Sequence, residues 1–256
     1  MNVTLLIAII LGLALVGFIA GRARALSSAG GDIRKLHSRP VYYGQAVLLF
    51  TAVPALVVLV AWLFVQPIAI NGRVSAEIPA SAVPEGGALS LVMSDVVRIA
   101  DGMDLMVAEG ALSERDLGVM RADISNIRSR LADVGVAVGT EVSQPVLRAA
   151  RDYRAMRNTG SLAMSVVVLL TAVGLLGWSL SRISPEQRAR NISESFIKAM
   201  LIGASMVAIL TTVGIVLSLL FETWHFFKLY PAKDFFFSAT WNPQFRGGSD
   251  LGILPL

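Results

Sequence analysis

Four apolar segments decide the class of fold that this chain can adopt, because each is long enough to cross a membrane as a helix. They cover residues 3–20, 44–70, 161–181 and 199–221. A helix rises about 1.5 Å per residue, and the hydrocarbon layer is roughly 30 Å thick. Hydrophobic residues make up 55% of the chain, more than a soluble core of this length needs. The sequence therefore predicts an all-α integral membrane protein with four transmembrane helices.

The first apolar segment has an alternative interpretation as a cleaved signal peptide. A signal peptide carries positive charge before its apolar core, whereas here Arg22 and Arg24 follow the core and no basic residue precedes it. We therefore expect an uncleaved first span. Gly17 and Gly21 lie four residues apart at its inner end, a spacing that lets another helix approach closely.

Two short basic connectors predict the orientation of the four spans. The loop 22–43 carries five basic residues against one acid: Arg22, Arg24, Arg34, Lys35 and Arg39 against Asp32. The loop 182–198 carries four basic residues: Arg182, Arg188, Arg190 and Lys198. Short loops rich in Lys and Arg are retained on the cytoplasmic side of a membrane. This pattern places the N-terminus and the long polar segment 71–158 on the outer side.

The polar segment 71–158 predicts a water-soluble helical domain. Apolar residues recur at helical spacing over 89–107 and again over 117–134. Ser113 and Asp116 resemble a capping box that begins the second of these helices. We expect the two helices to form an antiparallel hairpin.

A third soluble helix is predicted to begin near Pro145 and to continue without a breaker into the third span. Four arginines recur every three residues along it, just outside the membrane: Arg148, Arg151, Arg154 and Arg157. Two interpretations of this arginine stripe stay open. The stripe attracts an anionic solute or an acidic partner, or it is a solvated face near lipid headgroups in which Arg148 pairs with Asp152.

Residue types that carry chemistry in enzymes are sparse in this sequence. The absence of cysteine excludes disulfides, thiolate metal sites and cysteine nucleophiles. His37 and His225 fall on opposite sides of the membrane in the predicted topology, so they cannot share a metal. No phosphate-loop motif occurs, and no ionisable residue lies inside a span. We expect no enzyme activity and no catalytic, cofactor-binding or metal site.

The net charge of +4 does not indicate a nucleic-acid partner, because the basic residues sit mainly at membrane ends.

The tail 222–256 alternates aromatic and turn-forming residues and is expected at the outer membrane surface. Within the tail we expect a contact region formed by Phe235, Phe236, Trp241, Asn242 and Pro243. The closing residues 252–256 are apolar and have the composition of a segment that re-enters the bilayer, so we expect the natural chain to continue.

Several segments resemble one known family. Residues 37–44 (HSRPVYYG), followed by an apolar run that contains 52–55 (AVPA), resemble the N-terminal extension of some bacterial permeases of the phosphate ABC importer, the PstC-type subunit. The start of that family's permease core is similar to residues 188–191 (RARN), 209–222 (ILTTVGIVLSLLFE), 235–243 (FFFSATWNP) and 252–255 (GILP).

The resemblance implies a multi-pass subunit of the bacterial inner membrane with a periplasmic N-terminus. It also implies three protein partners, in addition to membrane lipid: a second permease subunit, a cytoplasmic ATPase dimer and a periplasmic phosphate-binding protein. ATP hydrolysis would belong to the separate ATPase. The family's later spans and coupling helix would lie beyond Leu256, so no transport residue is assigned here.

The predicted organisation has four parts. Residues 1–70 form a two-span membrane region, 71–158 a periplasmic three-helix domain with the hairpin, 159–221 the third and fourth spans, and 222–256 a periplasmic loop that leads into the permease core. An alternative function is a membrane-anchored periplasmic sensor, although the two inner connectors are too short to form an output module. A second alternative is an assembly scaffold with no transport role.

Overall fold

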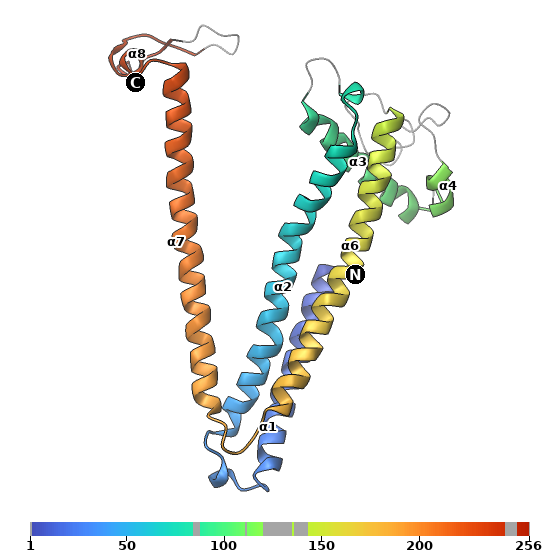
Figure 1. Cartoon of the computed structure of the whole chain (residues 1–256), viewed down its shortest axis with the longest axis vertical. Coiled ribbons are helices and arrows are strands. Elements are labelled where there is room, and N and C mark those ends of the chain that lie inside the picture. The colour runs from blue at the N-terminus through green and yellow to red at the C-terminus, as the bar shows by residue number, and fades with distance from the viewer. Residues whose placement is uncertain are drawn as a thin grey trace. The chain divides into compact units, whose positions relative to one another are not determined.

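The computed structural model describes residues 2–83, 88–110, 112–119, 135, 143–243 and 250–255. Four long helices dominate it: α1 (Val3–Ser28), α2 (Pro40–Glu77), α6 (Gln144–Ser181) and α7 (Ala189–Leu229) (Figure 1). Each contains a stretch that is long and apolar enough to cross a membrane. The predicted all-α membrane fold with four candidate spans is therefore confirmed.

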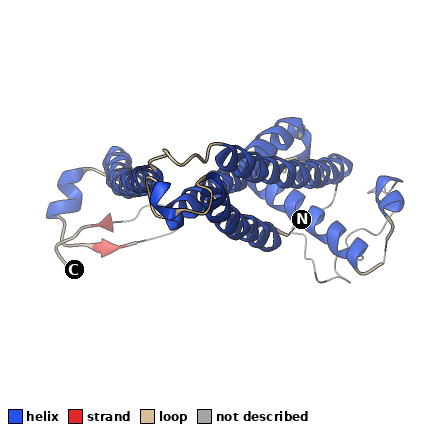
Figure 2. Cartoon of the chain, turned by 90° about the horizontal axis from the view of Figure 1, so that it is seen from below, coloured by secondary structure: helices blue, strands red, loops and turns tan. Residues whose placement is uncertain are grey.

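The remaining elements are short, apart from α3 (Leu89–Ala108). They are the 3₁₀ turns η1 (Ile33–Lys35) and η2 (Ala80–Ala82), the helices α4 (Glu114–Val119) and α8 (Ala232–Phe237), and the strands β1 (Trp241–Asn242) and β2 (Asp250–Leu251). The two strands pair antiparallel, with Trp241 opposite Leu251. Figure 2 shows them side by side. Two compact units make up the chain, residues 1–193 (unit 1) and 194–256 (unit 2).

The long helices continue past the predicted ends of their spans. Arg22 and Arg24 were expected in the connector, but α1 carries both and ends only at Ser28. Neither arginine disfavours a helix. Gly30 and Gly31 stop it, because their φ values of 63° and 83° are left-handed and favour glycine.

A membrane bundle of α1, α2 and α6 forms the body of unit 1. Its core stripe on α1 has spacings of three and four residues, which keep one helix face inward. The buried apolar residues of this core are Leu6, Ile10 and Ala14 of α1, Ala52, Ala55 and Leu59 of α2, and Met164, Val168 and Ala172 of α6. Large side chains elsewhere on the three helices are exposed, as expected for surfaces that face lipid.

Glycine lets α1 and α2 approach almost to backbone contact. A Cβ atom added at Gly21 would lie 3.3 Å from the Cα of Gly44, and one added at Gly44 would lie 2.5 Å from the Phe18 carbonyl oxygen. Gly17 faces Val47 of α2 in the same seam, with a Cβ distance of 3.0 Å. The pair Gly17 and Gly21 thus occupies a helix–helix interface, the use that its spacing predicted.

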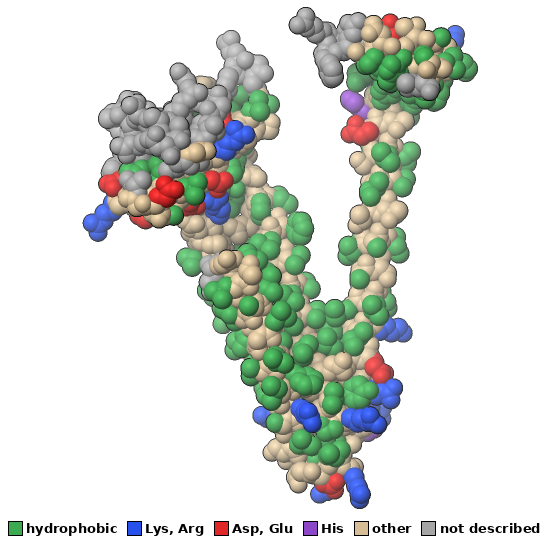
Figure 3. Space-filling view, turned by 180° about the vertical axis from the view of Figure 1, so that it is seen from behind, with side chains coloured by type: hydrophobic (Ala, Val, Ile, Leu, Met, Phe, Trp, Pro, Cys, Tyr) green, Lys and Arg blue, Asp and Glu red, His purple; other side chains and the backbone are tan. Residues whose placement is uncertain are grey.

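Both basic connectors lie at the same end of the bundle and bind each other. The His37 backbone N–H donates to the Pro185 carbonyl over 2.9 Å. Tyr43, only 1% exposed, donates its hydroxyl to the carbonyls of Pro185 and Gln187 at 3.2 and 2.9 Å. Figure 3 shows Lys and Arg side chains gathered at this end of unit 1. A common end for the two connectors agrees with the predicted topology, while the side of the membrane that it faces stays a prediction.

A second core lies at the opposite end of unit 1, where α3 packs against the first half of α6 and the last turns of α2. Val74 of α2, Val96, Ile99 and Met103 of α3, and Leu147 of α6 are almost fully buried there. The predicted boundaries of this domain at residues 70 and 158 fall inside α2 and α6, which run on continuously from the membrane bundle. The predicted soluble domain is therefore joined to the bundle by two helices and not by linkers.

The expected helical hairpin of this domain lies partly outside the described residues. Within them, the capping box begins α4 as predicted: the Asp116 backbone N–H donates to Ser113 Oγ at 3.2 Å, and the Ser113 N–H donates to Asp116 Oδ2 at 3.1 Å. Residues 120–134, most of the predicted second helix, are not among the described residues. The hairpin stays a prediction.

Candidate functional site

Two arginines of the predicted stripe lie in an ion-pair cluster between α6, α3 and α4. Arg154 Nε donates to Asp104 Oδ1 at 2.6 Å, and its terminal nitrogens donate to the Glu114 carboxylate at 2.6 and 2.7 Å. Arg157 donates to Asp101 at 2.5 Å and to the second carboxylate oxygen of Asp104. Asp104 therefore bridges both guanidinium groups.

Local helix geometry explains why these charges meet. Asp101 and Asp104 are three residues apart on α3, so they share a face, and Arg154 and Arg157 are spaced identically on α6. The apolar stripe of α3 packs that helix on α6, which brings the two faces together. Arg154 is only 13% exposed, and the hydrogen bonds that it donates to Glu114 and Asp104 raise its pKa. The same bond from Arg154 lowers the pKa of Glu114.

The other two arginines of the stripe lie elsewhere. Arg148 is exposed and lines a hollow of about 300 Å³ together with Glu77 and Asp152. Arg151 is half-buried, and this burial lowers its pKa. The attraction of an anion by the stripe stays a prediction, but Arg154 and Arg157 are paired with acids of the same chain. Their acidic partners were missed from sequence, although two acids at i,i+3 facing two arginines at i,i+3 offered a signal.

Lowering the pH is expected to release α4 from Arg154. The pKa of Glu114 lies below its usual value of 4.5, so its ion pair contributes fully above about pH 4.5 and is lost as the pH falls through the lowered pKa. A spin label at an Arg115→Cys site reports this release as increased label mobility in electron paramagnetic resonance spectra. In Glu114→Gln the mobile spectrum should already be present at neutral pH. If the spectra of Glu114→Gln and of the protein with Glu114 changed identically with pH, the ion pair between Glu114 and Arg154 would not be what holds α4.

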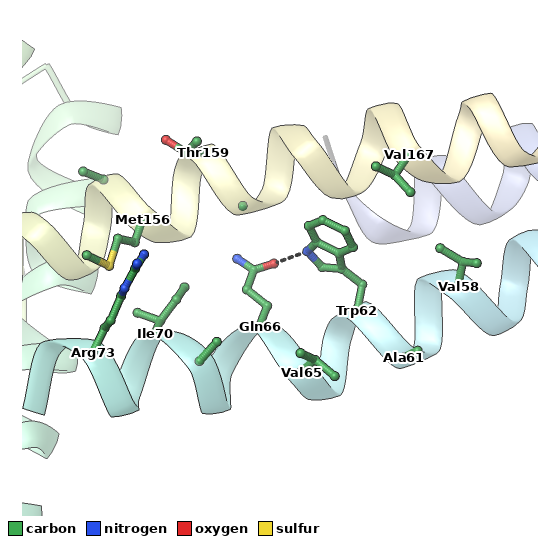
Figure 4. A pocket seen from close by; sticks show the side chains of 13 residues that line it. Val58, Ala61, Trp62, Val65, Gln66, Ile70, Arg73, Met156, Thr159 and Val167 are labelled. Carbon is green, nitrogen blue, oxygen red and sulfur yellow. Dashed lines mark hydrogen bonds between the residues drawn. The ribbon is translucent and has the colours of Figure 1, made fainter.

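A groove of about 750 Å³ lies between α2 and α6 where the bundle meets the soluble domain (Figure 4). We call it the α2–α6 groove. Its walls are almost entirely apolar, and α2 presents one continuous helical face to it. The lining residues are Val58, Ala61, Trp62, Val65, Gln66, Ala69, Ile70 and Arg73 of α2, and Ala155, Met156, Thr159, Gly160 and Val167 of α6.

Gln66 of α2 forms a hydrogen bond to the backbone of α6 inside the groove. Its Oε1 accepts from the Trp62 indole N–H at 2.9 Å, and its Nε2 donates to the Arg157 carbonyl at 3.2 Å. Figure 4 shows the Gln66 side chain pointing from α2 toward α6. A Cβ at Gly160 would lie 2.6 Å from Gln66 Nε2, so a larger residue there would have to displace the end of the Gln66 side chain. This contact could not be predicted from the sequence, because one glutamine in an apolar run carries no spacing pattern.

The predicted contact region of the tail lies in unit 2, on α8, β1 and the residue after it. Phe235 and Phe236 contact each other edge to face within an aromatic cluster that also contains Phe226, Phe227 and Tyr230. Trp241 is 44% exposed and Phe236 48% exposed. Asn242 and Pro243 are exposed as well. These residues are available at the surface of unit 2, and their contact role stays a prediction.

Metal and catalytic groups were not expected. Among the described residues, no group of three or more His, Asp or Glu side chains is placed to hold a metal ion. His37 lies in the connector between α1 and α2, whereas His225 lies in α7.

Comparison with known proteins gives one match. A family model described as "Phosphate ATP-binding cassette transporter" matches residues 7–177, which run from α1 almost to the end of α6. No curated protein and no solved structure matches the chain. The matched residues lie within unit 1 and include the membrane bundle, the ion-pair cluster and the α2–α6 groove.

Proposed function

Because the chain belongs to the phosphate ATP-binding cassette transporter family, whose model matches residues 7–177, we propose that it forms the N-terminal membrane part of the permease subunit of a phosphate importer. The observation that carries the proposal is this match over two-thirds of the chain, together with four helices able to span a membrane. Membership of the family implies partner subunits in general.

We propose three partner proteins for this chain, beginning with one that supplies ATP hydrolysis. Its sequence has no phosphate-loop motif, so the ATP hydrolysis that drives such a transporter would come from a separate cytoplasmic ATPase dimer. A second permease subunit would complete the translocation path, and a periplasmic binding protein would deliver phosphate. The apolar stretch of α7, which is long enough to span a membrane, supports contact with further membrane helices.

The proposal places the chain in the bacterial inner membrane with its N-terminus in the periplasm. The joined basic connectors support this orientation. Since the chain has no cysteine, single cysteines at exposed Ser27 and Glu109 test it directly. In intact spheroplasts, a membrane-impermeant thiol reagent should label Glu109→Cys and leave Ser27→Cys unlabelled. Labelling of Ser27→Cys but not of Glu109→Cys would show that the topology is the reverse of the proposed one.

Transport itself is tested by uptake of radiolabelled phosphate. A host whose own importer is deleted should regain saturable, ATP-dependent phosphate uptake when the full-length gene and its neighbouring subunits are expressed. Omitting only this chain should abolish that uptake, whereas uptake of radiolabelled sulfate should not change. Equal phosphate uptake with and without the chain would refute the permease role.

A membrane-anchored sensor is the second candidate, and one observation favours it. The single helix α6 runs from the soluble domain through the third span to the inner connector, so it joins an outer domain mechanically to the inner side. If this candidate is correct, omitting the chain would leave phosphate uptake by the other subunits intact and would change only its regulation by external phosphate. An assembly scaffold would instead lower the amount of the other subunits in the membrane.

A further inference from the structure

The α2–α6 groove has the shape, lining and charge of a lipid site. We propose that it holds an acyl chain of one anionic phospholipid, whose phosphate group is bound by Arg73. This site is independent of the transport function proposed above, because it is argued from the groove alone.

The walls of the groove suit an acyl chain. Small side chains on both helices, Ala61 and Ala69 on α2 and Ala155 on α6, leave the space open, and all three are exposed. From Val58 to Arg73 the groove follows α2 for 15 residues, or about 22 Å. One leaflet of the hydrocarbon layer is about 15 Å thick, half of the full layer. The groove is therefore long enough for a chain of one leaflet and its headgroup.

Charge is confined to one end of the groove. Among the described residues that line the groove, Arg73 is the only charged one, and it extends toward α6 beside Met156 (Figure 4). It lies where α2 leaves its apolar segment and passes into the soluble domain. No ion pair to Arg73 is found among the described residues, although the nearby arginines of α6 are paired. A guanidinium beside an apolar channel is complementary to a phosphodiester that carries an acyl chain.

A lipid explains this lining better than free phosphate does. A site for a small anion surrounds it with several donors, whereas here a single arginine adjoins walls that are almost entirely apolar. The groove also lies along two helices that have the composition of membrane spans, so phospholipid is the molecule at highest local concentration. Anionic headgroups near the membrane surface attract Arg and Lys side chains.

The test measures lipid retention by the full chain with native mass spectrometry from a mild detergent. The probes are phosphatidylglycerol and phosphatidylcholine with identical acyl chains, added at equal concentration. We expect one phosphatidylglycerol to be retained in preference to phosphatidylcholine. Arg73→Gln should weaken phosphatidylglycerol binding by about tenfold, the loss of one charge-assisted contact, and weaken phosphatidylcholine binding less, because the choline cation offsets the charge of its phosphate group.

Two further variants locate the acyl chain. Ala69→Phe fills the groove and should reduce retention of both lipids, whereas Ile68→Phe adds an aromatic ring at the adjacent position, which does not line the groove and is 73% exposed, and should change neither. Equal retention of the two lipids, or an unchanged result in Arg73→Gln, would refute the role of Arg73. Unchanged retention in Ala69→Phe would refute the groove as the site. Displacement of phosphatidylglycerol by excess inorganic phosphate would indicate a free-anion site and overturn the proposal.

Discussion

Replacing Gly44 with leucine is expected to lower the thermal unfolding midpoint of the detergent-solubilised protein by about 5 °C or more. A Cβ at this position would lie 2.5 Å from the Phe18 carbonyl oxygen, which belongs to the backbone of α1 and cannot rotate away. The two helices must separate, and their shared core would lose close packing. Overpacking of this kind costs about 1–3 kcal/mol, and occasionally more.

Gly72 on the same helix provides the matched control. A Cβ there meets nothing within 4 Å, so Gly72→Leu should leave the midpoint unchanged or raise it slightly, because leucine has the higher helix propensity. Both variants add the same side chain to α2, and only the contact with α1 differs. Equal midpoints for the two variants would show that the seam between α1 and α2 is not close-packed as described.

Asp104→Asn should loosen the docking of α3 on α6. Asparagine keeps the shape of the side chain but loses the negative charge, and its amide group places a donor against one of the two arginines that Asp104 bridges. Asp104 is 38% exposed, so solvent screening limits the effect to about 1–2 kcal/mol. Hydrogen exchange of the α3 amides should therefore accelerate by about tenfold.

The control for this prediction is Glu109→Gln, which removes one negative charge at the end of α3 outside the ion-pair cluster. Its exchange rates should match those of the parent protein. A double-mutant cycle of Asp104→Asn with Arg157→Gln should give a coupling of about 0.5 kcal/mol or more, since the two side chains are in contact. Additive effects would mean that the pair contributes no interaction of its own.

The membrane fold could be predicted from the sequence because hydropathy over about twenty residues does not depend on tertiary contacts. The helix ends could not be placed as well. Arg22 and Arg24 marked the end of a span, but a span and a helix end for different reasons, and α1 ends where Gly30 and Gly31 adopt left-handed φ values. In the same way, polar residues after Ile70 ended the second span while α2 continued to Glu77.

The sites depended on contacts that local spacing does not specify. The arginine stripe was visible, yet the acids that pair with Arg154 and Arg157 lie 40 to 56 residues away along the chain. The α2–α6 groove was missed because it exists only where two helices pack around Gln66 and Gly160. By contrast, Gly17 and Gly21 were assigned to a helix interface correctly, because a small pair four residues apart needs no partner sequence to indicate close approach.

Because α6 is one continuous helix, a movement of one of its ends also moves the other. Its 38 residues span about 57 Å without a glycine turn or proline break after its first turn. A helix of this length resists bending, so a tilt of its first half, where α3 and the ion-pair cluster are attached, is expected to move its last turn. Just beyond that turn lie Pro185 and Gln187, where Tyr43 holds them against the other connector. A displacement at the α3 end of unit 1 can therefore reach the connector end through one continuous helix, without passing through a loop.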